Sequence, residues 1–446
     1  MRAFLTYGDG IPRYIALWLP LMPALVGGLL ILRVRPRAVA MVVATTLPTF
    51  FLHNPPLRLP YLARWVALEV VLLGFVWWVV RSLRGTPPTA ARGAERAPWL
   101  ALVGLAALAV AVRAPLAWLD PGISDIPRAS EFAAGQLLAG LNPYVKANPH
   151  TVVGAYQYPA GSVLAHVPFV ALLPAEVLGE RWIPARMVLW VASAAAVFAL
   201  GWAASAAVGR RASLAVGLVL ALHPTLVRES GMVVANDVLL GLLVAGAAVA
   251  LACRRSLWCA ALVGLAISVK PSALVLVPLV AVVTGWRAGA LSLAVPGALQ
   301  LPFLLLPSPG LHGLAAMAEP ATRGDPWNVL QYSSWWPLYL AAPPSGLVLR
   351  AVTLLAIAAG SGTSLWAATR LRRTPPDLAT TSLALALPLL ATFLLGHRFR
   401  INFQDWYLVP FLVGVCVAGT SMPSRTVTWP PSPGHRRADT DAIVQT

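Results

Sequence analysis

Charged residues are scarce in this chain of 446 residues: they make up 11% of it, whereas hydrophobic residues make up 58%. Soluble proteins carry roughly 25% charged residues. A chain with so few charges cannot cover its surface with side chains that water solvates, so lipid must be its main solvent. Its long apolar runs are separated by short loops that carry arginine, and they predict α-helices rather than the alternating strands of a barrel.

Cysteine and lysine are also rare. Cys253, Cys259 and Cys416 form neither a disulfide framework nor a CxxC metal pattern. Only Lys146 and Lys270 among the 33 basic residues are lysines.

The net charge of +17 would suit nucleic-acid binding. However, the arginines lie between apolar runs, where they orient helices in a membrane, so no nucleic-acid partner is predicted. Abundant Arg, Ala, Gly and Pro suggest a GC-rich prokaryotic genome, and hence a prokaryotic plasma membrane.

Thirteen apolar runs predict transmembrane helices, if short and broken helices are allowed. We expect them at 14–32, 38–52, 64–81, 98–118, 184–208, 212–227, 238–252, 257–269, 271–285, 288–306, 346–368, 380–396 and 405–421. The eighth and ninth are short and meet at Lys270 and Pro271, which is typical of a broken helix facing a cavity. The predicted fold class is therefore an all-α polytopic membrane protein.

The arginines also set the expected orientation. Segments assigned to the interior carry 18 basic and four acidic residues, whereas exterior segments carry 15 basic and eleven acidic residues. This asymmetry places the N-terminus outside and the C-terminus inside. It requires that the apolar segment 159–178 does not cross but forms a juxtamembrane or re-entrant helix within a long exterior loop, 119–183. A second long exterior loop covers 307–345.

Polar side chains inside or at the edge of a membrane domain are costly, so they are functional candidates. In this chain they gather in segments predicted to be exterior. These candidates are Asp120, Asp125, Glu131, Glu229, Asp237, Lys270, Arg398, Arg400, Gln404 and Asp405. Carboxylates and cations thus converge on one face of the membrane.

Several short motifs in these segments resemble those of GT-C glycosyltransferases. They are SDI at 124–126, GLNPY at 140–144 and YQYP at 156–159, and FQDWYLVP at 403–410 resembles a late QYxxWxxP element. The likeness is greatest to the polyprenol-phosphate-mannose-dependent mannosyltransferases of glycosyltransferase family eighty-seven, although Ala160 stands where that family has a second proline. The resemblance covers residues 115–420. It implies a GT-C-like fold whose long first exterior loop is catalytic and contains juxtamembrane helices.

The resemblance also suggests how the chain is divided. Residues 1–97 are expected to form a three-helix membrane extension and a linker rich in Pro, Gly and Arg. Residues 98–421 correspond to the GT-C-like catalytic membrane domain. Residues 422–446 are rich in Pro, Ser and Arg and are predicted to be a disordered cytoplasmic tail.

By the same resemblance, Asp125 is the general base that deprotonates an acceptor hydroxyl. A helix N-cap is the alternative, because Asp125 precedes an Ile-Pro pair. Asp237, joined by Glu229, would position the donor or a divalent cation, and an N-cap is again the alternative for Asp237. The spacing of acids and histidines establishes no metal site. We expect Glu131 to face water on the loop helix. Asp120, which precedes a proline, is expected only to form a turn.

Lys270 is the main candidate for binding the donor phosphate, because a lysine between two apolar runs of an almost lysine-free chain is unusual. Its alternative is a snorkelling lysine at a helix end. Arg398 and Arg400 are further phosphate candidates, or an ordinary pair that meets lipid headgroups. The side chains predicted to position donor or acceptor are Tyr144, Tyr158 and Gln404.

The predicted activity is that of an integral-membrane glycosyltransferase. It moves a single sugar, with mannose favoured, from a polyprenyl-phosphate donor to a hydroxyl of a lipid or glycan acceptor on the exterior face. A membrane transporter or lipid-linked-glycan flippase is one alternative, but that class places ionisable residues near the bilayer centre, where only Glu69 plainly lies. An O-antigen-type ligase, which relies on Arg and His in a late exterior loop, is another.

Overall fold

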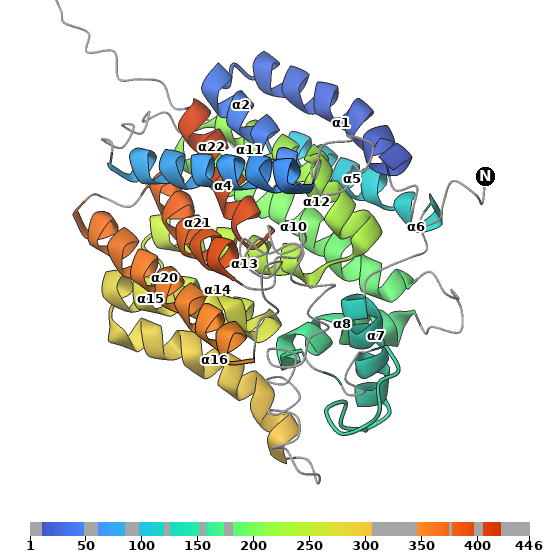
Figure 1. Ribbon diagram of the computed structural model, residues 1–446. Helices are drawn as coiled ribbons and strands as arrows, with labels where there is room; N and C mark the ends of the chain where they lie inside the picture. The colour runs from blue at the N-terminus through green and yellow to red at the C-terminus, as the bar shows by residue number, and fades with distance from the viewer. Residues whose placement is uncertain are drawn as a thin grey trace, which may run out of the picture.

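The computed structural model describes residues 11–48, 61–84, 98–119, 125–150, 156, 158–173, 182–305, 346–373, 377–396 and 405–420. All regular elements within these ranges are helices, which confirms the all-α prediction. Figure 1 shows them stacked as a bundle, with α7 and α8 beside one another at its lower right.

The helices cover most of each predicted apolar run except 38–52, of which a helix covers residues 38–44. In chain order they are α1 Ile11–Ile31, α2 Pro36–Ala44, α4 Tyr61–Arg84, α5 Trp99–Arg113, α6 Leu116–Leu119, α7 Asp125–Leu138, α8 Ala160–Leu172, α10 Ile183–Ala207, α11 Arg210–Leu222, α12 Pro224–Arg228, the π-helix η3 Glu229–Val233, α13 Asn236–Ala252, α14 Ser256–Val269, the 3-10 helix η4 Pro271–Leu276, α15 Val277–Thr284, α16 Trp286–Leu305, α20 Gly346–Arg373, α21 Leu378–Leu395 and α22 Asp405–Thr420.

Fewer of these helices than predicted can cross a membrane on length and hydropathy alone. Within the described ranges five qualify, namely Trp99–Trp118, Ile183–Ala207, Trp286–Leu305, Leu347–Arg373 and Leu378–Leu395. A sixth qualifies if α11 and the segment Pro224–Val233, which bend by 46° at their junction, form one span. The chain is therefore a multi-pass membrane protein, and the count of thirteen crossings is not confirmed.

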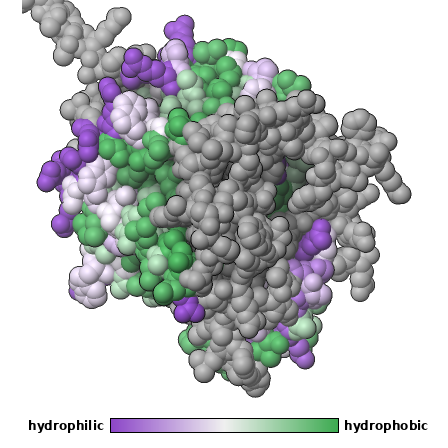
Figure 2. All heavy atoms as spheres, in the orientation of Figure 1, coloured by the Kyte–Doolittle hydropathy of each residue, from purple (hydrophilic) through white to green (hydrophobic). Residues whose placement is uncertain are grey.

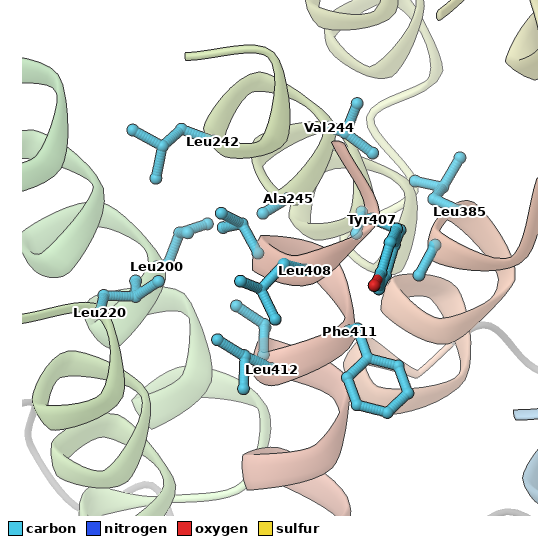
Figure 3. Packing of buried hydrophobic residues seen from close by; sticks show 14 of the residues in the cluster. Leu200, Leu220, Leu242, Val244, Ala245, Leu385, Tyr407, Leu408, Phe411 and Leu412 are labelled. Carbon is cyan, nitrogen blue, oxygen red and sulfur yellow. The ribbon is translucent and has the colours of Figure 1, made fainter. Parts of the chain in front are cut away.

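Helix α22 lies at the centre of the apolar core. Leu408 and Leu412 face the side of Leu200 and Leu220, while Phe411 lies on the side of α21 (Figure 3). Lipid tails are as apolar as leucine, so close packing rather than water exclusion holds such helices together. Gly414 lets α22 approach α21 closely, because a Cβ there would lie 2.7 Å from Leu383 Cγ and 3.2 Å from the Ala379 carbonyl oxygen.

The three N-terminal helices pack directly on this core. Helix α2 lies against α22, α1 against α11 and α4 against α21, and Figure 1 shows all three along the top of the bundle. The backbone N–H of Arg35 donates to the carbonyl of Gly419 over 3.0 Å. Buried side chains such as Leu25 and Val42 belong to the main core. Helices from both sides of the predicted boundary at residue 97 therefore share one core, and the boundary itself stays a prediction.

A buried arginine compensates for the break between α11 and α12. Pro224 has no N–H, so the carbonyl of Leu220 lacks its helical donor four residues on. The Arg113 guanidinium fills the gap: Nη2 donates to Leu220 over 3.0 Å, and Nη1 donates to Ala221 and Ala109 over 2.9 Å. Its Nε donates to Ser230 Oγ over 2.6 Å. Arg113 thereby joins α5 to both sides of the bend.

The outer surface of the bundle suits lipid. Large apolar side chains are exposed on α10, α16 and α20, among them Trp202, Leu293 and Leu354. The arginines of the short turns are exposed as well, as at Arg210 and Arg254. In Figure 2 hydrophobic atoms form patches at the top and on the left half of the visible face, and hydrophilic groups lie mainly at the upper left, the left edge and the lower right. Apolar sides with charged ends are what a membrane-embedded bundle needs.

Candidate functional site

The predicted break at Lys270 is confirmed. Helix α14 ends at Val269, Lys270 is extended with φ −153° and ψ 127°, and η4 begins at Pro271. A residue before proline is pushed out of the helical region, which explains why the break falls here. The short helix α14 therefore presents a lysine at its end.

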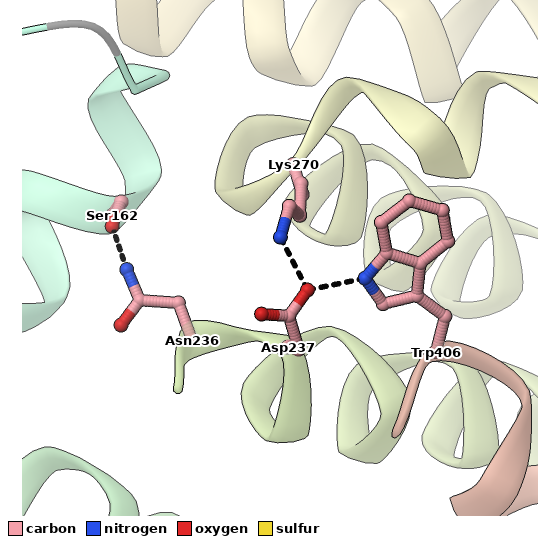
Figure 4. Close-up of polar contacts among 5 residues, drawn as sticks. All are labelled: Ser162, Asn236, Asp237, Lys270 and Trp406. Atoms are coloured by element: carbon pink, nitrogen blue, oxygen red, sulfur yellow. Dashed lines mark hydrogen bonds and ion pairs between the residues drawn. The ribbon is translucent and has the colours of Figure 1, made fainter. Parts of the chain in front are cut away.

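Lys270 is paired with a buried carboxylate. Asp237 Oδ1 accepts hydrogen bonds from Lys270 Nζ and from Trp406 Nε1, as Figure 4 shows. The Asp237 side chain is completely buried, whereas 14% of the Lys270 side chain is exposed. Lys270 Nζ also lies 5.2 Å from the centre of the Trp406 ring. The ends of α14, α13 and α22 thus meet at one cation, one carboxylate and one indole.

The N-cap alternative for Asp237 is wrong. Helix α13 begins at Asn236 and its N-cap residue is Ala235, so Asp237 lies inside the first turn. A carboxylate is favoured there by the positive end of the helix dipole. The Asp237 side chain is therefore available to hold Lys270 and Trp406.

The backbone just before Asp237 is strained. Val234 adopts the left-handed conformation with φ 58°, which is rare for a β-branched residue. It ends the π-helix that begins at Glu229, and the N–H of Ala235 donates to the Glu229 carbonyl over 2.9 Å. Strain and π-helical turns of this kind concentrate at functional sites.

Glu229 is fully buried near this turn. Its Oε1 is paired with Arg228, while Oε2 has no hydrogen-bond partner among the described residues. No group of three potential metal ligands occurs in the described part of the chain. Glu229 therefore stays a candidate for positioning, as predicted, and nothing assigns a metal to it.

Helix α8 lies against the same turn. Asn236 Nδ2 donates to Ser162 Oγ (Figure 4). Ser162 Oγ lies 3.3 Å from Ser130 Oγ on α7, and Ser130 Oγ lies 3.1 Å from the Tyr156 hydroxyl. All four side chains are buried. A continuous polar chain therefore runs from the first turn of α13 to α7 and α8, the helices within the predicted exterior loop 119–183.

The GLNPY motif fixes that loop to α16. Gly140, with φ 73°, ends α7 in the left-handed conformation that glycine favours. Asn142 Nδ2 then donates to the carbonyl of Phe303 over 2.9 Å. Tyr144 is buried, and its hydroxyl donates to the carbonyl of Tyr158 over 2.8 Å. Tyr158 itself is half-buried.

The expectation that Glu131 faces water is wrong. Its side chain is 5% exposed, and Oε2 accepts the backbone N–H of Ala185 in the first turn of α10 over 3.0 Å. Burial raises the pKa of Glu131 to about 7, and the bond from Ala185 opposes part of this rise. An α7 side chain thereby satisfies a free N–H at the start of α10.

Other predicted site residues fall outside the described part of the chain. Asp125 begins α7, but its side chain is not described, so the choice between base and N-cap stays open. Arg398, Arg400 and Gln404 lie outside the described residues entirely, as does the segment 307–345 that was predicted to be an exterior loop. The side chain of Glu69 is likewise not described.

Three contacts of the site were missed from the sequence. In the late motif the sequence pointed to Gln404, but it is Trp406, two residues on, whose indole N–H donates to Asp237. Asn236 immediately precedes Asp237, and that proximity was the available signal. Ser162 carries no signal of its own, because serine is common in apolar helices.

No family model and no curated protein matches this sequence. Among solved structures, the chain is similar to the crystal structure of ArnT from Cupriavidus metallidurans bound to undecaprenyl phosphate, with 19% sequence identity and a TM-score of 0.47. The match covers 73% of this chain and spans 60% of the length of that one. A likeness of this degree assigns the chain to no family.

Proposed function

We propose that this protein is an integral-membrane glycosyltransferase that moves one sugar, with mannose favoured, from a polyprenyl-phosphate donor to an acceptor hydroxyl of a lipid or glycan on the exterior face. The observation that carries the proposal is the pairing of Lys270 with buried Asp237 and Trp406 at the end of a broken helix. The order of the GLNPY, YQYP and late aromatic motifs supports the same activity.

The chemistry requires a cation at the donor phosphate. The acceptor oxygen forms a bond to the anomeric carbon, the bond from that carbon to the phosphate oxygen breaks, and the acceptor proton passes to a base. The phosphate leaves with one more negative charge than it carried in the ester. Lys270 supplies opposing charge in a site with little water, where such stabilisation is strongest. Asp125 takes the proton in this proposal.

Asp237 and Trp406 prepare Lys270 for this role. A lysine stem has four rotatable bonds, so an unrestrained ammonium would be poorly aimed. Asp237 holds Nζ from one side, and the indole N–H keeps the Asp237 carboxylate in place. Arg398, Arg400 and Gln404 complete the donor site in this proposal, and Tyr158 and Glu229 line it.

The test is an assay of donor cleavage and sugar transfer by the purified protein in nanodiscs. Polyprenyl phosphates carrying mannose, glucose or galactose are supplied, and released polyprenyl phosphate is measured. Asp125→Asn should lower turnover by at least about 100-fold, because general-base catalysis contributes about 10²–10⁴-fold. Asp120→Asn, at a nearby exterior aspartate followed by proline, is the matched control and should keep wild-type turnover.

Folded wild-type protein that cleaves none of the three donors would overturn the proposal and favour a transporter. Cleavage of only the glucose or galactose donor would keep the proposed enzyme class but exclude mannose as the transferred sugar. Equal turnover of both Asn variants and the wild type would move the base away from Asp125.

A further inference from the structure

Helix α8 touches both elements that carry the Lys270–Asp237 pair. At Gly161 the approach to α14 is so close that a Cβ would lie 2.7 Å from the carbonyl oxygen of Ser268, two residues before Lys270. At the next position, Ser162 Oγ accepts the Asn236 amide, one residue before Asp237. Two consecutive residues of α8 thus fix its place relative to the lysine and the aspartate.

The contact continues into α7. Because the Asn236 amide donates to Ser162, the Ser162 hydroxyl is free to donate onward to Ser130, and Ser130 to the Tyr156 hydroxyl. Ser130 lies about 1.4 helical turns after Asp125, the first residue of α7. Hydroxyls bonded in one direction reinforce each other.

We propose that Ser162 and Asn236 are positioning residues, whose mutual hydrogen bond sets α7 and α8 relative to the Lys270–Asp237 pair. The bridge carries no reacting atom. In the proposed reaction, the first exterior loop holds the acceptor and the base. The bridge keeps both at a fixed distance from the donor phosphate. This inference rests on the proposed function for its catalytic part only.

A purely structural role would not need these polar groups. Buried polar side chains cost free energy unless they are satisfied, and apolar side chains of similar size pack at least as well. What a satisfied polar chain adds is a single allowed arrangement of the elements it joins. A displacement near 1 Å at a reacting centre costs about 100-fold in rate, so the arrangement of α8 matters to catalysis.

The experiment compares Ser162→Ala and Asn236→Ala, which remove the same bond from opposite ends. Ser205→Ala is the matched control, because Ser205 is also buried but its hydroxyl makes no hydrogen bond among the described residues. Both bridge variants should lower kcat by about 10- to 100-fold with the donor KM within about twofold of wild type. The double variant should be no slower than the slower single variant. Ser205→Ala should keep wild-type kcat.

Hydrogen exchange of the backbone gives a readout that needs no activity. Loss of the bridge should raise exchange in residues 125–138 of α7 while residues 378–395 of α21 stay protected. Unchanged kcat in both bridge variants, or a loss equal to that of Ser205→Ala, would overturn the catalytic part. Unchanged exchange in α7 would overturn the bridge. If wild type cleaves no donor, the proposed function fails, and the exchange data alone decide whether the bridge holds α7.

Discussion

Lys270 is held by a buried acid, so its removal should act on stability as well as on the proposed binding of the donor. In Lys270→Met the apolar stem remains but the Asp237 carboxylate loses its cation. Losing the contact to the donor phosphate should weaken donor affinity by about 10- to 150-fold, the equivalent of about 1.5–3 kcal/mol. Lys270→Arg should restore affinity only in part, because a planar fork replaces a compact charge. The donor affinities of wild type, Lys270→Met and Lys270→Arg, measured in one type of nanodisc, test both expectations.

A double variant separates the two effects. Lys270→Met combined with Asp237→Asn removes cation and anion together, so thermal stability should recover relative to Lys270→Met alone while donor affinity stays low. Lys146→Met, at the only other lysine of the chain and an exposed one, is the control and should change neither quantity. Recovery of affinity in the double variant would contradict the assigned role.

Single residues of the site were predictable where their type was unusual. Lys270 stood out in a chain with two lysines, and Asp237 stood out at the edge of an apolar run. Trp406 did not stand out among 17 tryptophans, and its role depends on where α22 begins relative to α13. Glu131 was misjudged because the sequence of α7 does not reveal that α10 starts beside it.

The contact between α7 and α10 should make stability depend on pH. The pKa of Glu131 is about 7 in the folded protein, because burial raises it above the ordinary value of 4.5 for a solvated glutamate. Between these values the folded state holds a proton that the unfolded state has released. The free energy of unfolding should therefore fall as pH rises from about 4.5 to 7, by at most about 1.4 kcal/mol per pH unit.

Glu131→Gln should flatten this dependence, because the amide oxygen can still accept the N–H of Ala185 but does not titrate. The melting temperature of wild type and variant, followed from pH 4.5 to 7.5 in the same detergent, measures the difference. Parallel curves for the two proteins would show that Glu131 does not cause the slope.

At the scale of elements, proline and charge predicted the boundaries well. The break at Lys270 and Pro271 and the short helix within 159–178 both appear in the structure. The π-helix before α13 and the left-handed Val234 were not predicted. Local propensity opposes a valine in that conformation, so only the surrounding packing can impose it.

The orientation of the whole molecule can be tested with a native residue. Cys253 is exposed beside Arg254, in a turn expected to be interior, whereas Cys259 and Cys416 are buried. A membrane-impermeant maleimide should therefore leave wild-type protein in intact cells unlabelled and label it after the membrane is opened. Lys146→Cys, at an exposed position of the loop predicted to be exterior, should be labelled in intact cells. Labelling of Cys253 from outside would reverse the predicted topology.

The number of crossings is harder to predict than the positions of helices. Helices α13, α14 and α22 have 17, 14 and 16 residues, which is short for a membrane of about 30 Å. Hydropathy identified them as spans because they are apolar. Neighbouring helices cover nearly all of α22, so its apolar residues are buried in protein, whereas α14 exposes Leu257 and Trp258. Composition alone does not distinguish burial in protein from burial in lipid.

The order in which Arg113 and Pro224 are replaced during evolution should matter, because only one order leaves no buried carbonyl without a donor. If Arg113 is lost first, the carbonyl of Leu220 is left without a donor in the interior, at a cost of about 1–3 kcal/mol. If Pro224 is lost first, the new residue brings back a backbone N–H, and Arg113 keeps its bonds to Ala109 and Ser230. In lineages where this helix becomes straight, Pro224 should therefore have been replaced before Arg113. Relatives that keep Pro224 but lack Arg113 should be rare.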